Sequence, residues 1–296
     1  MNFFSYILGQ FLNFINILSI LKYHFFNNKN FIEYFFYLKK VNALSKKNIK
    51  NKYKIQKLNN SQLKNIKKTN KVFIFGSGYS IKGISSNEWK KLKNYDSIGF
   101  NNTIFLKKIN FTYHINRMIK NSKKNAKHQI KIINNNPYLR KTTFLMPEGF
   151  VEEYTNNVFS KNLWDKNKKF FLFKTNRFLG LPIGNINVGL IHKVGTLMDC
   201  ITLAYYLGYK KIVLVGVDLY DTRYFYVPKN KTSAILNIPS NKNEHGHAPD
   251  HIHSTMINKI DHNIRSINKF FKKKNISLEV YNKKSLLKKE LKIFKF

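Results

Sequence analysis

Four histidines lie within nine residues of one another: His245, His247, His251 and His253. Asp250 lies among them. A histidine beside an acceptor hydroxyl can act as a general base, because its pKa lies near neutral pH. The His-x-His pairs with Asp250 could instead bind a metal ion, although no further ligand follows at a motif spacing. We take the general base as the working hypothesis and expect no metal, while a metal site and a solvated loop stay open.

A second group of polar side chains follows an apolar run at residues 212–215. That β-branched run is typical of a strand buried on both faces of a parallel sheet. Ligands of open α/β sheets bind outside the carboxyl ends of the strands, so the loop after this strand is expected to contribute to a binding site. Its polar and aromatic residues are Asp218, Tyr220, Asp221, Arg223, Tyr224 and Tyr226.

The segment before this strand predicts a helix over residues 196–207, with Leu197, Ile201 and Ala204 at helical spacing. Gly208 follows, where a left-handed residue would end the helix. The helix contains Cys200, the one cysteine of the chain, so no intrachain disulfide can form. We interpret Cys200 as a small core residue rather than a nucleophile.

Two other predicted strands, at residues 72–75 and 97–100, end in residues that suit a nucleotide. Glycine after the first strand lets the backbone approach a phosphate, and the next helix offers free N–H groups. The third glycine of the dinucleotide fingerprint is absent, so this loop alone is a weak motif. The candidate residues are Gly76, Ser77, Gly78 and Ser80 after the first strand, and Asn101 and Asn102 after the second.

Strand and helix patterns alternate from residue 71 onward, which predicts an α/β fold with a Rossmann-like, mostly parallel sheet flanked by helices. We assign residues 71–296 to this domain and residues 1–70 to an N-terminal hydrophobic helix and a basic linker, which is solvated or loosely helical. A lid subdomain is expected at about 151–194 and 227–253. Further strands are expected at 111–115, 143–145 and 276–281, and helices at 117–133, 255–273 and in the basic tail, 285–296.

Residues 1–21 contain no charged side chain, yet their polar residues fall close to one helical stripe. Such a segment suits a helix lying in the membrane interface. Packing on the protein and a true membrane span are the alternatives. The segment has no basic start and no small-residue cleavage site, which argues against a secretory signal peptide.

The formal net charge is +38, but only five of the 53 basic residues are arginine. Because arginine is the preferred residue for bases and phosphates, its scarcity indicates biased composition, and we expect no nucleic-acid partner. The positive field would still favour anionic lipid surfaces and anionic substrates.

Four sequence blocks together resemble the bacterial sialyltransferases of glycosyltransferase family 42, over about residues 71–287. They are KVFIFGSGYSIKGI, GFNNTIF, GTLMDCITLAYYLGYKKIVLVGVDLY with a tyrosine six residues on, and a His-Ser pair before a helix. The resemblance implies one Rossmann-like domain with a lid that binds CMP-sialic acid. It implies an inverting displacement in which a histidine deprotonates the acceptor hydroxyl, and it implies no cofactor.

The resemblance also assigns roles to individual residues. Tyr220 and Tyr226 match two tyrosines that bind the departing phosphate, and His253 matches the base. Asn101 matches an amide that holds the nucleotide, Thr196 a serine facing the donor, and Lys193 an arginine. Ser77 departs from the family, which has asparagine there, and His251 or His247 could replace His253 as the base.

We therefore expect a glycosyltransferase that moves sialic acid from CMP-sialic acid to a sugar hydroxyl of a surface glycan or lipooligosaccharide. The expected location is cytoplasmic, peripherally associated with the inner face of the membrane, and a homo-oligomer is compatible with the sequence. Another nucleotide-activated donor on the same fold is one alternative. A non-enzymatic basic protein that binds membrane or RNA is the other.

Overall fold

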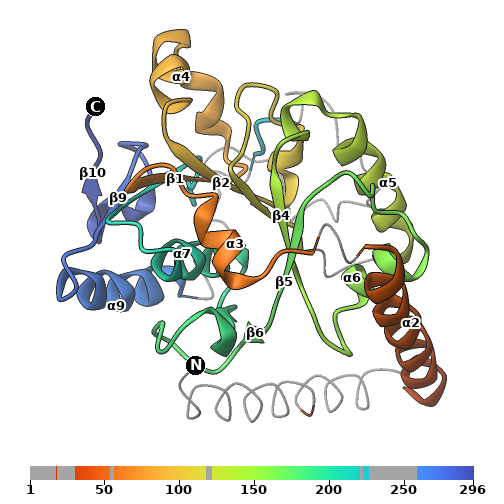
Figure 1. Cartoon of the computed structure of the whole chain (residues 1–296). Helices are drawn as coiled ribbons and strands as arrows, with labels where there is room; N and C mark the ends of the chain where they lie inside the picture. The colour runs from red at the N-terminus through yellow and green to blue at the C-terminus, as the bar shows by residue number, and fades with distance from the viewer. Residues whose placement is uncertain (1–17, 19–30, 54–56, 118–121, 221–222, 227–258) are drawn as a thin grey trace.

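The structure is a computed structural model that describes residue 18 and residues 31–53, 57–117, 122–220, 223–226 and 259–296. Its centre is an eight-stranded sheet in the order β10-β9-β8-β1-β2-β3-β4-β5, and every pair of neighbouring strands runs parallel (Figure 1). The strands are β1 (Lys71–Phe75), β2 (Asp96–Phe100), β3 (Tyr113–Ile115), β4 (Thr143–Pro147), β5 (Phe170–Phe173), β8 (Lys211–Val215), β9 (Ser277–Val280) and β10 (Lys292–Ile293). Strands β6 (Thr175–Asn176) and β7 (Leu190–Ile191) form a separate parallel pair. The α/β fold with a parallel sheet is confirmed.

Helices cover both faces of the sheet, because side chains of a strand point alternately to opposite sides. Val72 and Ile74 of β1 face the core under α3, α7 and α9, whereas Phe73 and Phe75 face the core under α4, α5 and α6. The helices are α2 (Phe31–Lys52), α3 (Asn60–Asn65), α4 (Ser86–Leu92), α5 (Ser122–Asn135), α6 (Glu153–Ser160), α7 (Thr196–Tyr206) and α9 (Ile260–Lys272). Short 3-10 turns are η1 (Tyr79–Gly83), η2 (Asn101–Phe105), η3 (Pro137–Leu139), η4 (Ile186–Val188) and η6 (Leu286–Lys289).

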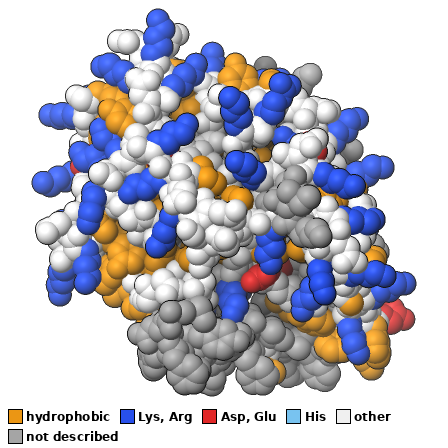
Figure 2. All heavy atoms as spheres, in the orientation of Figure 1, with side chains coloured by type: hydrophobic (Ala, Val, Ile, Leu, Met, Phe, Trp, Pro, Cys, Tyr) orange, Lys and Arg blue, Asp and Glu red, His pale blue; other side chains and the backbone are white. Residues whose placement is uncertain are grey.

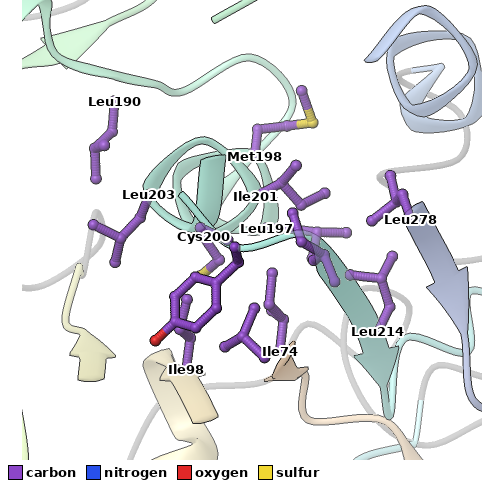
Figure 3. Close-up of a cluster of buried hydrophobic side chains, with 14 of the residues drawn as sticks. Ile74, Ile98, Leu190, Leu197, Met198, Cys200, Ile201, Leu203, Leu214 and Leu278 are labelled. Carbon is purple, nitrogen blue, oxygen red and sulfur yellow. The ribbon is translucent and has the colours of Figure 1, made fainter. Parts of the chain in front are cut away.

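Helix α7 is the most deeply buried helix next to the site, and Figure 3 shows its side chains over the sheet. Cys200 and Ile201 are fully buried in the same cluster as Ile74 of β1. Burial raises the pKa of the Cys200 thiol well above its usual range, so the prediction of a core cysteine is confirmed. Gly208 has a φ of +76°, the left-handed conformation expected just after the helix.

The described part of the N-terminal region is a packed helix rather than a free linker. Helix α2 lies against α6, where the Tyr34 hydroxyl donates to Glu153 at 3.2 Å and the Asn48 amide donates to the Phe159 carbonyl at 2.9 Å. Leu38 is fully buried. Apolar residues at helical spacing therefore dock α2 on the domain, while the boundary at residue 70 stays a prediction.

Two expectations from the sequence need correction. The stretch 151–194 is not a lid throughout, because α6 packs in the helical layer and β5 is the edge strand of the main sheet. The tail forms η6 and strand β10 instead of an amphipathic helix. Pairing of β10 with β9 buries Phe294 against Phe73 and Tyr281, which a free helix could not do. The expected lid at 227–253 lies outside the described residues.

Basic side chains are spread over the described part of the face in Figure 2 and do not gather in one groove there. Within the described residues, no helix is long and apolar enough to cross a membrane. The uncharged segment 1–21 lies outside the described residues except for Leu18, which is helical and half exposed.

Candidate functional site

The strand order changes direction between β1 and β8, where the chain, after running from β1 out to β5, returns to the other side of β1. Ligands of open α/β sheets bind at such a switch point, outside the carboxyl ends of the strands. The Gly76–Ser80 loop follows β1, and Gly216 and Asp218 follow β8, so both predicted segments meet at this point.

The two segments touch through their backbones. Gly76 donates its N–H to the Val215 carbonyl and Gly78 to the Gly216 carbonyl, each at 2.8 Å. A Cβ atom at Gly78 would lie 2.5 Å from the Asp218 Oδ2 and 2.6 Å from the Gly216 oxygen, so only glycine fits. Glycine is therefore needed here for strand-to-strand contact as much as for approach to a phosphate.

These bonds change which N–H groups the loop can offer to a ligand. The N–H groups of Gly76, Gly78 and Ser80 are all bonded within the protein. Among the described residues, the Ser77 N–H has no acceptor and remains available, whereas the Tyr79 N–H is turned towards the Arg223 carbonyl in the bridge between Gly78 and Tyr224. The loop therefore offers the single Ser77 N–H to a ligand rather than the successive N–H groups of an anion-binding nest.

Asp218 is buried, and its carboxylate is fully used by neighbouring groups. Oδ1 accepts from the Ser80 hydroxyl at 2.5 Å and from the Asn282 amide at 2.8 Å, while Oδ2 accepts from the Ser80 N–H at 2.8 Å. The sequence places Asp218 and Ser80 among the donor-binding residues. Their geometry shows that they hold each other, so their effect on a ligand is to fix the position of the glycine loop.

The two tyrosines expected to bind a departing phosphate have separate partners. The Asn282 amide lies 3.5 Å from the Tyr220 hydroxyl, and the Asn102 amide donates to the Tyr226 hydroxyl at 2.6 Å. The Tyr226 ring stacks on Phe105 and on Tyr224. Burial raises the pKa of Tyr226, with Tyr224 adding to the effect, so the hydroxyl keeps its proton. Its oxygen accepts from Asn102, and its hydrogen is thereby directed to another acceptor.

Residues 223–226 run alongside the glycine loop. Gly78 and Tyr224 form an antiparallel bridge, and Phe225 donates its N–H to the Ser77 carbonyl at 3.1 Å. The Arg223 guanidinium lies 4.1 Å from the centre of the Tyr79 ring. Burial raises the pKa of Tyr224 to about 12. This segment therefore forms an aromatic wall over the loop that the sequence assigns to the nucleotide.

Asn101 and Thr196 meet at the next strand end, where the Asn101 amide donates to the Thr196 hydroxyl at 3.2 Å. The Asn101 Oδ1 is buried and has no hydrogen-bond partner among the described residues. Thr196 is the first residue of α7, and Gly195 caps that helix without a side-chain bond. Lys193 precedes this turn and is exposed. These three predicted residues thus lie around the N-terminus of α7.

Two bulky residues near the site adopt the left-handed conformation that such side chains rarely take. Val194 has a φ of +70° just before α7, and Leu219 has a φ of +64° between Asp218 and Tyr220. Such residues cost about 1–3 kcal/mol each and cluster at functional sites. Both strained positions belong to the turns that the sequence assigns to the site.

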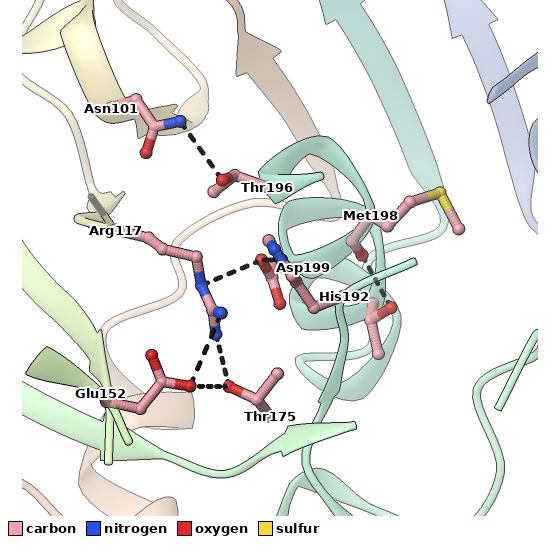
Figure 4. Close-up of polar contacts among 9 residues, drawn as sticks. Asn101, Arg117, Glu152, Thr175, His192, Thr196, Met198 and Asp199 are labelled. Atoms are coloured by element: carbon pink, nitrogen blue, oxygen red, sulfur yellow. Dashed lines mark hydrogen bonds and ion pairs between the residues drawn. The ribbon is translucent and has the colours of Figure 1, made fainter. Parts of the chain in front are cut away.

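A buried cluster of charged side chains continues the carboxyl edge beyond Asn101 (Figure 4). Arg117, which follows β3, lies 3.7 Å from both Glu152 and Asp199, and it donates to the Thr175 hydroxyl. His192 Nδ1 lies 2.6 Å from the Asp199 Oδ2. Arg117 and Asp199 are almost completely buried, so the pair is shielded from solvent.

The protonation of His192 follows from its surroundings. Burial lowers its pKa, Arg117 lowers it further, and Asp199 opposes both. The ring is therefore neutral near neutral pH, and in that state Nδ1 carries the proton donated to Asp199. The half-buried Arg177, one residue beyond β6, is affected by the same charges. Burial lowers the pKa of its guanidinium, the negative charge of Glu152 raises that pKa, and the positive charge of Arg117 lowers it.

Sequence reasoning missed this charged cluster. Arg117 belongs to no sequence motif, and Asp199 stands inside an otherwise largely apolar helix. A single carboxylate on the buried face of a helix is a usable signal, because a buried charge needs a partner. Its cationic partner, Arg117, lies 82 residues earlier in the chain, a separation that local spacing does not connect.

All four histidines of the predicted base or metal segment, with Asp250, lie outside the described residues. The described residues contain no group of three or more His, Cys, Asp or Glu side chains that could hold a metal ion. The assignment of His253 as the base therefore stays a prediction.

No known family model matches the chain, and no curated protein matches it. Among solved structures, the monofunctional alpha-2,3-sialyltransferase Cst-I from Campylobacter jejuni is similar to it, with 14% identity and a TM-score of 0.47. The similarity covers 76% of this chain and 80% of that chain. A likeness at this level carries no argument about activity, which has to come from the residues of this chain.

Proposed function

We propose that the protein is an inverting glycosyltransferase that moves sialic acid from CMP-sialic acid to a sugar hydroxyl of a surface glycan or lipooligosaccharide. The observation that carries the proposal is the meeting of the glycine loop with the loop after β8 at the switch point of the sheet. Three of the four resembling sequence blocks support the choice of donor, because they fall on these strand ends and on α7.

The chemistry of a CMP-linked sugar fits this edge of the sheet. As the bond between the anomeric carbon and the phosphate oxygen breaks, its electron pair and negative charge move to the phosphate. The Tyr226 hydroxyl, held by Asn102, and the N–H group of Ser77 are donors that could stabilise that charge. His253 is proposed to take the proton of the acceptor hydroxyl as its oxygen attacks the anomeric carbon.

Donor screening tests the proposal directly. A ligand that binds only the folded state stabilises it by about 2.7 kcal/mol at a hundredfold excess over its dissociation constant. We expect CMP and CMP-sialic acid to raise the melting temperature, and UDP or GDP sugars to have no such effect. A shift with UDP or GDP sugars alone would establish another donor on the same fold. RNA binding that weakens steeply with salt, without any nucleotide shift, would establish the non-enzymatic alternative.

We further propose peripheral attachment to the inner face of the membrane, with residues 1–21 as the main contact. Supporting this, α2 exposes Ile32 at 68% and Phe36 at 60% of their surfaces, near Lys39 and Lys40. Apolar residues beside lysines suit an anionic lipid surface. Deleting residues 1–21 should release the protein from anionic vesicles and leave turnover on a soluble acceptor intact. Loss of folding on that deletion would show that the segment packs on the protein instead.

A further inference from the structure

Buried polar atoms without a hydrogen-bond partner are concentrated on the half of the carboxyl edge that lies away from the proposed nucleotide loop, Gly76–Ser80. Of the twelve such atoms in the described residues, seven lie at or just beyond the ends of β2, β3 and β6 and on α7. They are Asn101 Oδ1, Asn116 Oδ1, Arg117 Nε and Nη1, Asn176 Nδ2, Arg177 Nε and Asp199 Oδ1. Because buried polar groups are nearly always bonded, such a concentration indicates the site of a polar ligand.

Arg177 is the cation of this group that is left to bind an anion. Arg117 already lies between Glu152 and Asp199 and donates to Thr175. Arg177, in contrast, makes no hydrogen bond or ion pair with any residue the structure describes. An arginine keeps its charge in proteins, and its planar fork matches a carboxylate or a phosphate.

The position of Arg177 is set by the small sheet of β6 and β7. Asn176 pairs with Ile191, and His192 donates its N–H to the Asn176 carbonyl at 2.7 Å, which places Arg177 beside His192. The Asn176 Oδ1 accepts the N–H groups of Phe178 and Leu179 and so closes the turn after Arg177. Both ends of the Arg177 backbone are thus fixed, as a preorganised binding residue requires.

The remaining unpartnered atoms suit hydroxyl groups. The oxygens of Asp199, Asn116 and Asn101 are acceptors, and a sugar ring presents several hydroxyl donors. A ligand with both an anionic group and many hydroxyls would satisfy the donors and the acceptors together. The Asn101–Thr196 contact joins this half of the edge to the half assigned to the nucleotide.

We propose that Arg177 and the unpartnered polar atoms around it form a subsite for an anionic sugar unit, in which Arg177 binds the carboxylate or phosphate of that sugar. The inference rests on the proposed glycosyltransferase function and names its second binding region. The sugar unit belongs either to the donor or to the acceptor.

The test uses the full chain and two pairs of sugars in which one member carries an anionic group and the other does not: N-acetylneuraminic acid with its methyl ester, and glucose 6-phosphate with glucose. Binding is measured by calorimetry for the wild type, Arg177→Gln and Arg140→Gln, since Arg140 is an exposed arginine remote from the cluster. Arg177→Lys is the second variant, because it keeps the charge and loses the fork.

We expect the wild type to bind the charged member of at least one pair at least tenfold more tightly than the neutral member. Arg177→Gln should abolish that preference, Arg177→Lys should reduce it, and Arg140→Gln should keep it. Equal binding or no binding of both members by the wild type would overturn the proposal. So would a preference that survives in Arg177→Gln.

Turnover separates the two sources of the sugar unit. A KM raised tenfold or more for CMP-sialic acid in Arg177→Gln assigns the subsite to the donor, and one raised for the acceptor assigns it to the acceptor. Binding of CMP alone should be unchanged in this variant. If CMP fails to bind the wild type, the donor assignment is wrong, while the result with free sugars still decides the anionic subsite.

Discussion

The two halves of the carboxyl edge bury polar groups in different ways. Around β1 and β8, glycine backbones touch and every oxygen of Asp218 is bonded. Around β3, β6 and α7, Arg117 lies 3.7 Å from its two carboxylates, and several polar atoms lack partners among the described residues. The hydrogen bonds of the first half are formed without a ligand, and they fix the loop in position to bind a ligand through its backbone. The second half contains buried charges and polar atoms that a bound ligand would pair. Substitutions in the two halves should therefore affect stability and ligand binding to different extents.

The largest expected effect is on the charged half. Arg117→Met leaves Asp199 as a buried carboxylate without its cation, and breaking a buried pair in this way costs about 3–5 kcal/mol. Unfolding in urea measures the loss. Arg265→Met is the matched control, because Arg265 is exposed and its ion pair with Glu290 should contribute little to stability. Equal losses in the two variants would show that the buried cluster has no special energetic role.

The next effect concerns chemistry on the nucleotide half. Tyr226→Phe removes the hydroxyl that Asn102 orients, so kcat should fall by tens to hundreds of fold, about 2–4 kcal/mol, with little change in KM. Tyr220→Phe is expected to behave similarly. Tyr95→Phe is the control, because Tyr95 precedes β2 at the opposite edge of the sheet. Full turnover in the Tyr220→Phe/Tyr226→Phe double variant would make both residues packing residues.

A smaller effect tests the backbone contact at the switch point. Gly78→Ala would force the Asp218 carboxylate and the Gly216 carbonyl apart, at a cost of about 1–3 kcal/mol. Thermal unfolding and CMP affinity should both fall, because the same displacement moves the loop donor. Gly83→Ala is the control, since a Cβ there meets no atom within 4 Å. Unchanged CMP affinity in Gly78→Ala would remove the loop from the nucleotide site.

The last effect is a pH dependence that originates at His114 in β3. His114 is fully buried, its Nε2 lies 3.1 Å from the Thr103 hydroxyl, and burial lowers its pKa from 6.5 to about 3. Below about pH 6.5 the unfolded chain gains a proton that the folded protein cannot bind, so stability falls as the pH drops towards 3. Between pH 7.5 and 5 this residue should account for about 2 kcal/mol.

Urea unfolding at pH 7.5 and pH 5 measures that dependence. His114→Gln should be destabilised at both values but should lose about 2 kcal/mol less than the wild type between them. An equal loss in both proteins would show that His114 does not control the acid limb.

The central part of the fold was predictable from the sequence because its signals are local. The run at residues 212–215 is apolar and largely β-branched, and Gly208 follows α7 in the left-handed conformation that glycine permits. The same patterns predicted the strands around the glycine loop and the burial of Cys200. The tail helix was wrong, and part of the predicted lid at 151–194 belongs to the main sheet, because sheet pairing of β10 and β5 overrides the local pattern of a basic or aromatic stretch.

By itself the sequence determined the period of the apolar residues, the positions of the glycines and the residues at each strand end, since these depend on chain neighbours and side-chain chemistry alone. Only the tertiary structure decided which of those residues meet. Asp218 is turned inward to Ser80 and Asn282 because the Gly76–Ser80 loop lies against β8. Arg117 meets Asp199 because β3 and α7 are packed together across more than eighty residues of sequence. Contacts of that kind are fixed by the packing of whole elements, which no local spacing records.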